Sequence, residues 1–421
     1  MKLLKGLEIL VQLTLRRYKP FIVAVTGSVG KTSTKLAIKA VLGRARRVRA
    51  SSGNFNSELG TSLAILGDWS PEELKLVSRD QPAGTAKVQK ILFWLKVLFT
   101  GAWHLIIRVA NYPEILILEY GADRPGDIKY LTRLAKPMIG IITAVGEIPV
   151  HVEFYAGPEE LAKEKGKLIE ALPAAGFAIL NADDETVLNL KDRTRARIMT
   201  FGFSKDADVR VSHLVNRSEG ERPIGVSFKL EYGGAYAPVR LDGIFGRAHA
   251  SAAAAGAAVG LLFGMNLVTI SEALADYSPA DSRMKLMLGI KGTYLIDDAY
   301  NASPLSMHAA LDTLRDLPGK RRIAVLGDML EIGKYSIEAH EAIGDLAAKS
   351  ADALFTVGAH AKFIASAAQQ SGMKKANIFS FDTADDARIP VQNFLAQGDI
   401  VLLKGSHAME LSKVVEEIRM P

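Results

Sequence analysis

Continuous apolar runs alternate with stretches of helical periodicity along most of the chain. The runs cover residues 21–25, 115–118, 139–143, 178–180, 294–296, 323–326, 354–357 and 400–403. Short apolar runs without polar alternation are typical of strands buried on both faces, which occur in parallel sheets covered by helices. The pattern therefore predicts an α/β fold with parallel strands.

Two regions depart from this rhythm. Residues 207–244 contain short alternating segments, and Gly233 and Gly234 mark a hairpin between two of them, which predicts an antiparallel patch. Residues 248–265 are rich in alanine and glycine and predict a tightly packed helix. The strand and helix rhythm restarts near residues 282–292, so we expect a central domain over 20–285 and a C-terminal domain over 286–421.

Two segments combine helical periodicity with a mixture of apolar and basic residues. In residues 1–17, Lys5 and Glu8 interrupt the apolar run and no cleavage site of small residues follows, so we expect a retained helix rather than a signal peptide. In residues 87–108, the density of charge argues against a membrane-spanning helix. Each segment fits two interpretations, a helix packed on its own protein or an amphipathic helix in an anionic membrane interface.

Composition narrows the possible chemistry. The 421 residues suffice for two or three packed units, and the absence of cysteine excludes disulfides, thiolate nucleophiles and Cys-ligated metal sites. The net charge of +6 is unevenly distributed, because residues 1–50 contain 12 Lys and Arg against a single acid, Glu8. The basic end is therefore expected to face an anionic partner, either a phosphorylated ligand or a lipid surface.

A glycine-rich loop follows the first apolar run and precedes a helical stretch. Its sequence TGSVGKTST places backbone N–H groups and the start of a helix where they can bind phosphate oxygens. Lys31 supplies a point charge, and Thr32 offers a hydroxyl for Mg²⁺. The predicted phosphate-binding residues are Gly27, Ser28, Val29, Gly30, Lys31, Thr32 and Ser33.

The loop and seven later blocks resemble the Mur ligases, and in particular the members that add D-alanyl-D-alanine. The loop has the short spacing of that family rather than the common GxxxxGK[ST] spacing. The later blocks are NFNSELG (54–60), LILEYGADRPGDI (116–128), GEIPVHVEF with LAKEKGKLI (146–169), LNADD (180–184), DDAYNASPLSM (297–307), VLGDMLEIG (325–333) with His340, and LLKGSHAME (402–410).

This resemblance implies an ATP-dependent amide ligase of peptidoglycan precursor synthesis. ATP would phosphorylate a carboxylate of a UDP-N-acetylmuramoyl tripeptide, and the amine of D-alanyl-D-alanine would attack the acyl phosphate. ATP is needed because a carboxylate is a poor electrophile towards amines, whereas an acyl phosphate carries a leaving group. The implied fold is a central parallel-sheet domain like those of P-loop NTPases, with a small antiparallel patch, and a Rossmann-like C-terminal α/β domain.

The resemblance also implies a catalytic and metal-binding set. Lys31, Glu119, His151 and Lys165 would be catalytic, and Thr32, Glu119, His151 and Lys165 would surround Mg²⁺. Glu119 also ends the run ILIL, at the sheet edge where ligands of parallel sheets gather. Lys165 matches a lysine that is carbamylated in the family, and a desolvated lysine has a lowered pKa that lets its neutral amine take up CO₂. The alternatives are an ordinary loop histidine at 151 and a salt-bridged helical lysine at 165.

Further residues are assigned by the same resemblance. His249 stands where the family usually has an asparagine that contacts adenine, Arg283 matches an arginine that reaches ATP phosphates, and Asp298 matches an acid near the ribose and phosphates. Asn54, Asn56 and Glu58 would border the activated carboxylate, and the incoming dipeptide would be held by Tyr300, Asn301, Lys404 and Ser406. Structural ion pairs at the domain seam and turn-forming asparagines are the alternatives.

One departure concerns the uridine part of the substrate. Relatives begin with a separate uridine-binding domain, whereas only about 20 residues precede the phosphate strand here, so we expect that domain to be missing. An insertion at about 68–112 would then hold the substrate or dock the enzyme on a membrane.

Three functions are compatible with these features. The first is the D-alanyl-D-alanine-adding ligase, the second is another amide ligase of the superfamily, of the folylpolyglutamate or cyanophycin synthetase type, and the third is a non-catalytic nucleotide-binding module at a membrane. For the first we expect a cytoplasmic monomer with UDP-muramoyl peptide and D-alanyl-D-alanine as substrates and no nucleic-acid partner. Residues 1–17 or 87–108 would give it peripheral contact with the inner face of the membrane.

Overall fold

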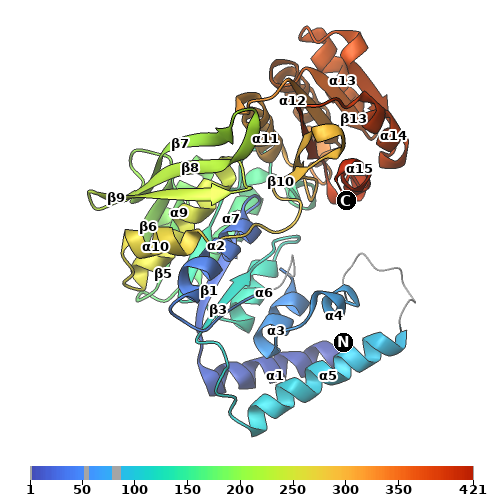
Figure 1. The fold of residues 1–421 in the computed structure, drawn as a ribbon. Coiled ribbons are helices and arrows are strands. Elements are labelled where there is room, and N and C mark those ends of the chain that lie inside the picture. Colours follow the sequence, from blue (N-terminus) through green and yellow to red (C-terminus); the bar gives the residue numbers. More distant parts are fainter. Residues whose placement is uncertain (1, 52–55, 78–86, 421) are drawn as a thin grey trace.

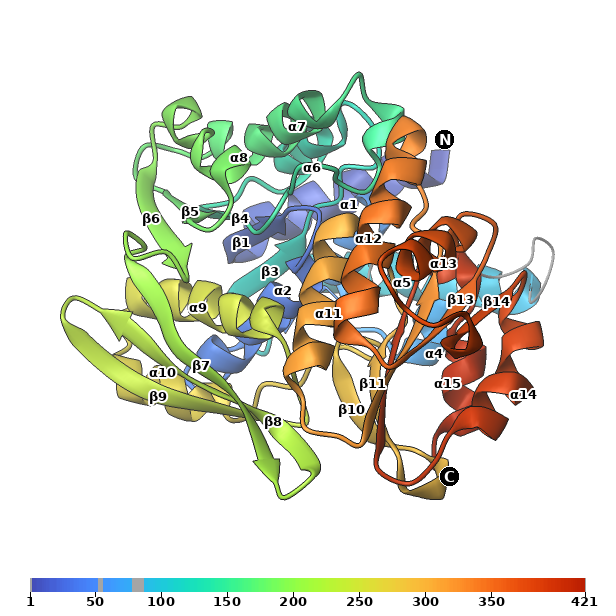
Figure 2. The same cartoon turned by 90° about the horizontal axis from the view of Figure 1, so that it is seen from above.

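Two β-sheets, each covered by helices on both faces, make up the structure, a computed structural model that describes residues 2–51, 56–77 and 87–420 (Figure 1). The first sheet belongs to the N-terminal two thirds of the chain and the second to the C-terminal third. Seen from above in Figure 2, the antiparallel end of the first sheet lies to one side of the second sheet.

Within the described residues the first sheet has nine strands in the order β2-β3-β1-β4-β5-β6-β7-β8-β9. The strands pair in parallel as far as β7, and β7, β8 and β9 pair antiparallel. Their bounds are β1 (Phe21–Thr26), β2 (Val48–Ala50), β3 (Ile115–Glu119), β4 (Ile139–Ile142), β5 (Phe177–Asn181), β6 (Arg197–Gly202), β7 (Val209–Glu219), β8 (Arg222–Tyr232) and β9 (Ala235–Asp242).

Alternate residues of β1 are buried in two different hydrophobic cores, one on each face of the sheet. Val23 and Val25 pack on one face against the helices α2 and α9, and Ile22 and Ala24 pack on the other face among α1, α3, α5 and α6. The helices of this part are α1 (Lys2–Tyr18), α2 (Lys31–Gly43), α3 (Glu58–Leu66), α4 (Pro71–Lys75), α5 (Lys87–Ile106), α6 (Asp127–Leu134), α7 (Pro158–Glu170), α8 (Glu185–Leu188), α9 (Arg247–Leu262) and α10 (Leu267–Leu274).

The second sheet has the order β10-β11-β15-β12-β13-β14, in which β10 alone of these strands runs antiparallel to its neighbour. Its strands are β10 (Lys285–Leu288), β11 (Tyr294–Asp298), β12 (Arg321–Gly327), β13 (Ala353–Val357), β14 (Ile378–Phe381) and β15 (Asp399–Lys404). The helices α11 (Pro304–Asp316), α12 (Ser336–Ser350), α13 (Ala361–Gln370), α14 (Ala384–Phe394) and α15 (Ser412–Ile418) cover it.

The structure confirms the predicted α/β class and the antiparallel patch. Gly233 and Gly234, with φ of 58° and 82°, form the hairpin between β8 and β9. The alanine-rich stretch is the helix α9, which approaches α2 so closely that a Cβ at Gly256 would lie 3.1 Å from the Ala37 carbonyl carbon. Small residues are therefore required where these two helices meet.

The two amphipathic segments are the helices α1 and α5, which pack on each other and on α3. On α1 the polar residues Glu8 and Gln12 turn towards the protein: Glu8 accepts a hydrogen bond from Tyr130, and Gln12 Nε2 donates to the Leu134 carbonyl at 2.7 Å. Both helices therefore pack on their own protein through one side, as the first interpretation predicts. No helix in the described part of the chain has both the length and the apolar character needed to cross a bilayer.

Candidate active site

The predicted phosphate loop connects β1 to α2 at the carboxyl edge of the first sheet. Gly27 and Gly30 have φ of 145° and 88°, values that favour glycine. A Cβ at Gly27 would lie 2.0 Å from Thr143 Oγ1, whose hydroxyl donates to the Val29 carbonyl at 2.7 Å. The loop is therefore fixed by β4 on one side and by the start of α2 on the other.

Buried charges gather under this loop. Lys31 Nζ donates to the Gly27 carbonyl at 2.9 Å, Thr32 Oγ1 donates to Glu119 Oε2 at 3.0 Å, and Lys35 Nζ lies 3.0 Å from the same oxygen. Burial alone would raise the pKa of Glu119, but the charges of Lys35 and Lys31 outweigh it and keep that pKa below its ordinary value. Burial lowers the pKa of Lys31, against the attraction of Glu119.

Lys165, on α7, completes what we call the phosphate-loop cluster (Lys31, Lys35, Glu119 and Lys165). Its Nζ donates to the Gly27 carbonyl at 3.1 Å, and its side chain is buried. Burial, followed by the charge of Lys31, moves the pKa of Lys165 well below its usual value. A neutral amine next to the loop is the form that reacts with CO₂, so the environment suits carbamylation.

The donors beside the loop fit Mg²⁺. The Thr32 hydroxyl and the Glu119 carboxylate are adjacent hard oxygen ligands of the kind that bind Mg²⁺ together with phosphates and water. The Ser28 hydroxyl is buried with no hydrogen-bond partner within the described residues, as expected for a group that faces an anion. In the described ranges no three His, Asp or Glu side chains form a metal site on their own, so phosphate oxygens would have to supply further ligands.

Arg283 lies between the two sheets, beside the phosphate-loop cluster. Its neighbours Ser282 and Met284 both have left-handed φ, 55° and 50°, a conformation that is strained for residues with side chains. The guanidinium lies 4.2 Å from the centre of the Tyr300 ring, and Arg283 Nε is buried with no partner in the described residues. Its positive charge lowers the pKa of both Lys31 and Glu119, although it is not the largest influence on either.

His249 holds the backbone of this junction. Its Nε2 lies 2.9 Å from the Arg283 carbonyl, which can only accept, so Nε2 carries the proton and Nδ1 accepts from the Tyr277 hydroxyl at 2.7 Å. Burial lowers the pKa of His249 to about 4, which keeps the ring neutral. Both ring nitrogens of His249 therefore have partners within the protein. The sequence predicted a contact with adenine for this residue and did not predict these two partners.

His151 connects the two domains. Its Nδ1 lies 2.7 Å from Glu331 Oε2 of the C-terminal domain, and its Nε2 lies 3.6 Å from Asp123 Oδ1. The charge of Asp123 also acts on the pKa of Lys31 and Lys165, which places it near the loop. His151 is therefore linked to the phosphate-loop cluster through Asp123 and to the second sheet through Glu331.

The residues that are predicted to bind the dipeptide include the buried Lys404. Lys404 Nζ donates to Asp298 Oδ2 at 2.6 Å and to the Asn301 carbonyl at 2.9 Å, and burial lowers its pKa despite that carboxylate. Ser406 Oγ accepts from the Leu330 N–H at 2.9 Å. Asp298 also accepts from the Met284 N–H at 3.1 Å, so it is tied to the same backbone as Arg283. We call Arg283, His249, Asp298, Lys404 and the His151–Glu331 contact the domain junction.

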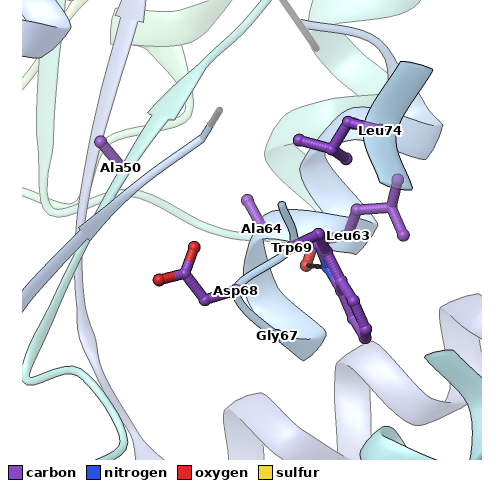
Figure 3. Close-up of a pocket in the computed structure, with 8 residues that line it drawn as sticks. Ala50, Leu63, Ala64, Gly67, Asp68, Trp69 and Leu74 are labelled. Atoms are coloured by element: carbon purple, nitrogen blue, oxygen red, sulfur yellow. Dashed lines mark hydrogen bonds between the residues drawn. The ribbon is translucent and has the colours of Figure 1, made fainter. Parts of the chain in front are cut away.

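Of the three residues that are predicted to border the activated carboxylate, Asn54, Asn56 and Glu58, the two that the structure describes have different partners. Asn54 lies outside the described residues. The Asn56 carbonyl accepts from the Gly121 N–H at 2.8 Å, close to Glu119, whereas Glu58 Oε1 lies 2.7 Å from the Tyr130 hydroxyl oxygen. The nearby pocket in Figure 3, between the end of β2 and α3, has a volume of about 10 Å³, room for about one water molecule, so it is not a substrate site.

Sequence reasoning missed Lys35, Asp123, Glu331 and Tyr277. Lys35 had a usable signal, because it follows Lys31 by one helical turn and so lies on the same face of α2. Asp123 is four residues after Glu119 in the same quoted block. Glu331 and Tyr277 contact their partners only through the packing of distant segments, for which the sequence contains no local signal.

Known proteins match this chain over nearly its whole length. Residues 102–260 match the Mur ligase middle domain, and residues 282–407 match the glutamate ligase domain of Mur ligases. The UDP-N-acetylmuramoyl-tripeptide–D-alanyl-D-alanine ligase of Mycobacterium tuberculosis is 31% identical over 94% of this chain and 72% of its own length. The ligase of the same name from Bacillus subtilis is 28% identical over 99% of this chain and 79% of its own length.

Solved structures agree on the fold. MurF ligase from Thermotoga maritima, solved in complex with ADP, has a TM-score of 0.78 and 25% identity over 98% of this chain and 83% of that chain. Folylpolyglutamate synthase of Mycobacterium tuberculosis has a TM-score of 0.66 at 14% identity over 98% of this chain and 96% of that chain, a likeness that concerns the fold alone. On the identity and coverage of the mycobacterial relative, this chain belongs to the Mur ligase family.

Proposed function

We propose that the chain is an ATP-dependent amide ligase that joins D-alanyl-D-alanine to a UDP-N-acetylmuramoyl tripeptide. The observation that carries the proposal is the phosphate-loop cluster, in which three lysines and a carboxylate converge under a glycine-rich loop. The Bacillus subtilis relative named for this reaction matches 99% of this chain, a span that includes the loop and Lys404. The domain limits 20–285 and 286–421 are part of this proposal.

The proposed reaction has two steps. The carboxylate of the tripeptide attacks the terminal phosphorus of ATP and displaces ADP, and the amine of the dipeptide then attacks the acyl phosphate and displaces phosphate. Lys31 and Arg283 stabilise the negative charge on the transferred phosphoryl group. Asp298 and Lys404 form the part of the site that belongs to the C-terminal domain. Tyr300, Asn301 and Ser406 would orient the dipeptide there. Asn56 and Glu58 would border the acyl substrate.

Mg²⁺ belongs to the proposed site. Thr32 and Glu119 would hold it, with a carbamylated Lys165 and His151 as further candidates, and when bound it supplies charge neutralisation for the phosphates. The neutral form of Lys165, favoured by burial, supports the carbamate. Because ATP and UDP-linked precursors are cytoplasmic metabolites, we place the enzyme in the cytoplasm, and we propose that it acts as a monomer.

The test is product formation by the purified chain with ATP, Mg²⁺ and both substrates, measured by mass spectrometry together with phosphate release. Phosphate release that requires both substrates, and a pentapeptide product, would support the proposal. The variant Lys31→Ala should lower turnover by about 10³-fold, whereas Lys39→Ala, which changes an exposed lysine on the same helix, should leave it unchanged.

Two other outcomes would overturn the proposal. Turnover with a folate and glutamate, or with an aspartate polymer and arginine, in place of the muramoyl substrates would identify another amide ligase of the superfamily. ATP binding without turnover of any of these substrates would favour a non-catalytic module.

A further inference from the structure

The helix α5 exposes a continuous apolar stripe. Seven side chains spaced by three or four residues or adjacent to one another are 44 to 76% exposed: Val88, Ile91, Leu92, Leu95, Phe99, Trp103 and Ile106. The opposite side of the helix, with Phe93, Val97, Gly101 and His104, is buried. The helix is thus apolar on both sides, and only one side is covered by its own chain, which is unusual for a surface helix.

The helix α1 adds to the same surface. Ile9 and Leu13 are 61% and 41% exposed, on the side away from the buried Leu7 and Val11. The two helices approach closely, since a Cβ at Gly101 would lie 3.3 Å from the Leu10 side chain. Figure 1 shows them side by side along the bottom edge of the molecule. The exposed stripes of α1 and α5 together form what we call the α1–α5 face.

The charged residues of the helices α1 and α5 themselves are nearly all basic. Exposed basic side chains stand towards the ends of the two helices: Lys5, Arg16, Arg17, Lys87 and Arg108. In residues 5–19 and 87–108 the single acid is Glu8, and its carboxylate accepts a hydrogen bond from Tyr130. On α5, Lys96 is paired with Glu73 of α4. The face therefore combines exposed apolar and aromatic side chains with a basic border formed by the residues at the helix ends.

We propose that the α1–α5 face binds the interfacial region of a membrane that contains anionic lipids. Apolar side chains would enter the boundary between headgroups and acyl chains, Trp103 would lie at headgroup level, and the basic border would contact lipid phosphates. Two copies of the face would bring two basic borders together, and the repulsion disfavours a symmetric dimer through this surface. Binding would occur in the plane of the membrane, with the rest of the molecule on the aqueous side.

The test is co-sedimentation of the full chain with vesicles. We expect binding to vesicles of phosphatidylcholine with phosphatidylglycerol, and much weaker binding to phosphatidylcholine alone. The double variant Leu95→Glu/Phe99→Glu should lower the partition coefficient by at least about tenfold. The matched control Val268→Glu/Ile389→Glu introduces the same charge at exposed apolar positions elsewhere and should bind like the unmodified chain.

A second double variant tests the contribution of the basic border to membrane binding. Arg16→Gln/Arg17→Gln should weaken binding to the anionic vesicles by at least about tenfold, since each basic side chain near a membrane surface contributes about fivefold. Raising the salt concentration should weaken binding of the unmodified chain for the same reason. Quenching of tryptophan fluorescence by brominated lipids should decrease in Trp103→Phe.

Three results would overturn the proposal: no binding to anionic vesicles, equal binding of the stripe variant and its control, or a dimer of the unmodified chain that dissociates in the stripe variant. The last would assign the face to a second copy. Ligase activity on water-soluble substrates should be the same in the stripe variant as in the unmodified chain, because Leu95 and Phe99 are exposed on α5 and belong neither to the phosphate-loop cluster nor to the domain junction. That measurement separates failure of this proposal from failure of the proposed function.

Discussion

The phosphate-loop cluster and the domain junction hold their charges in different ways. In the cluster, Lys35 and Glu119 are 1% and 2% exposed and satisfy each other within one domain. In the junction, the His151–Glu331 contact joins two domains, and its partners are 26% and 43% exposed. The cluster is thus preorganised by a single fold, whereas the junction depends on how the two domains pack.

The difference has an energetic consequence. A buried charge that loses its partner costs several kcal/mol, because the remaining charge stays desolvated. An exposed pair costs at most about 1 kcal/mol, because water replaces the partner. Variants in the cluster should therefore have large effects on activity and stability, and variants of the exposed junction contact should have small ones.

The largest effect is expected for Lys31→Ala. The loss of a charge aimed at the transferred phosphoryl group should lower kcat/KM by about 10³-fold, the upper part of the range for one electrostatic contact in an active site. Steady-state kinetics of the amide-forming reaction measures it, with thermal unfolding to show that the variant is folded. A loss below tenfold would contradict a catalytic role for the cluster.

The same contrast separates what the sequence reveals from what it hides. Glu119 was predictable because it ends a buried apolar run, and buried runs of this kind mark parallel strands. The strands β2, β10 and β14 were not predicted, since they lie at sheet edges, are only partly buried and lack such a run. The contact between His151 and Glu331 spans 180 positions in the chain and arises from domain packing, which no local pattern encodes.

The next effect concerns stability and pH. His249 has a folded-state pKa of about 4, below its ordinary value near 6.5, because it is buried. Between these pH values the unfolded chain binds a proton that the folded chain does not, so the free energy of unfolding should fall as the pH falls. By about pH 5 the loss attributable to His249 should reach about 2 kcal/mol.

Urea unfolding of the unmodified chain and of His249→Gln at about pH 7.5 and about pH 5 tests this expectation. The glutamine does not titrate, so its variant should lose less stability over the same interval. Equal losses in both proteins would mean that the ring is not held neutral between Tyr277 and the Arg283 carbonyl.

A smaller effect is expected from removal of CO₂. If the buried amine of Lys165 carries a carbamate, depletion of CO₂ and bicarbonate should lower the rate by about tenfold, as loss of a supporting metal-site group does. Added bicarbonate should restore the rate. The carbamate should disappear as the pH falls below the lowered pKa of Lys165, because a protonated amine does not react with CO₂.

Carbon-13 NMR with labelled bicarbonate provides a readout that is independent of turnover. A carbamate signal should be present in the unmodified chain and in Lys163→Met, which changes an exposed lysine on the same helix, and absent in Lys165→Met. A signal that persists in Lys165→Met would assign the carbamate to another amine.

The smallest effect is expected for Glu331→Gln, which removes the charge of the exposed junction contact and keeps the shape of the side chain. A contact between groups this exposed contributes at most about 1 kcal/mol, so kcat/KM should fall by about threefold. Glu341→Gln, the same change at an exposed position of α12, should have no effect. Separate measurement of kcat and of KM for ATP shows whether the contact acts on chemistry or on domain closure around the nucleotide. A loss as large as that of Lys31→Ala would show that Glu331 holds His151 in the reacting geometry, and the junction would then be as strongly coupled to catalysis as the buried cluster.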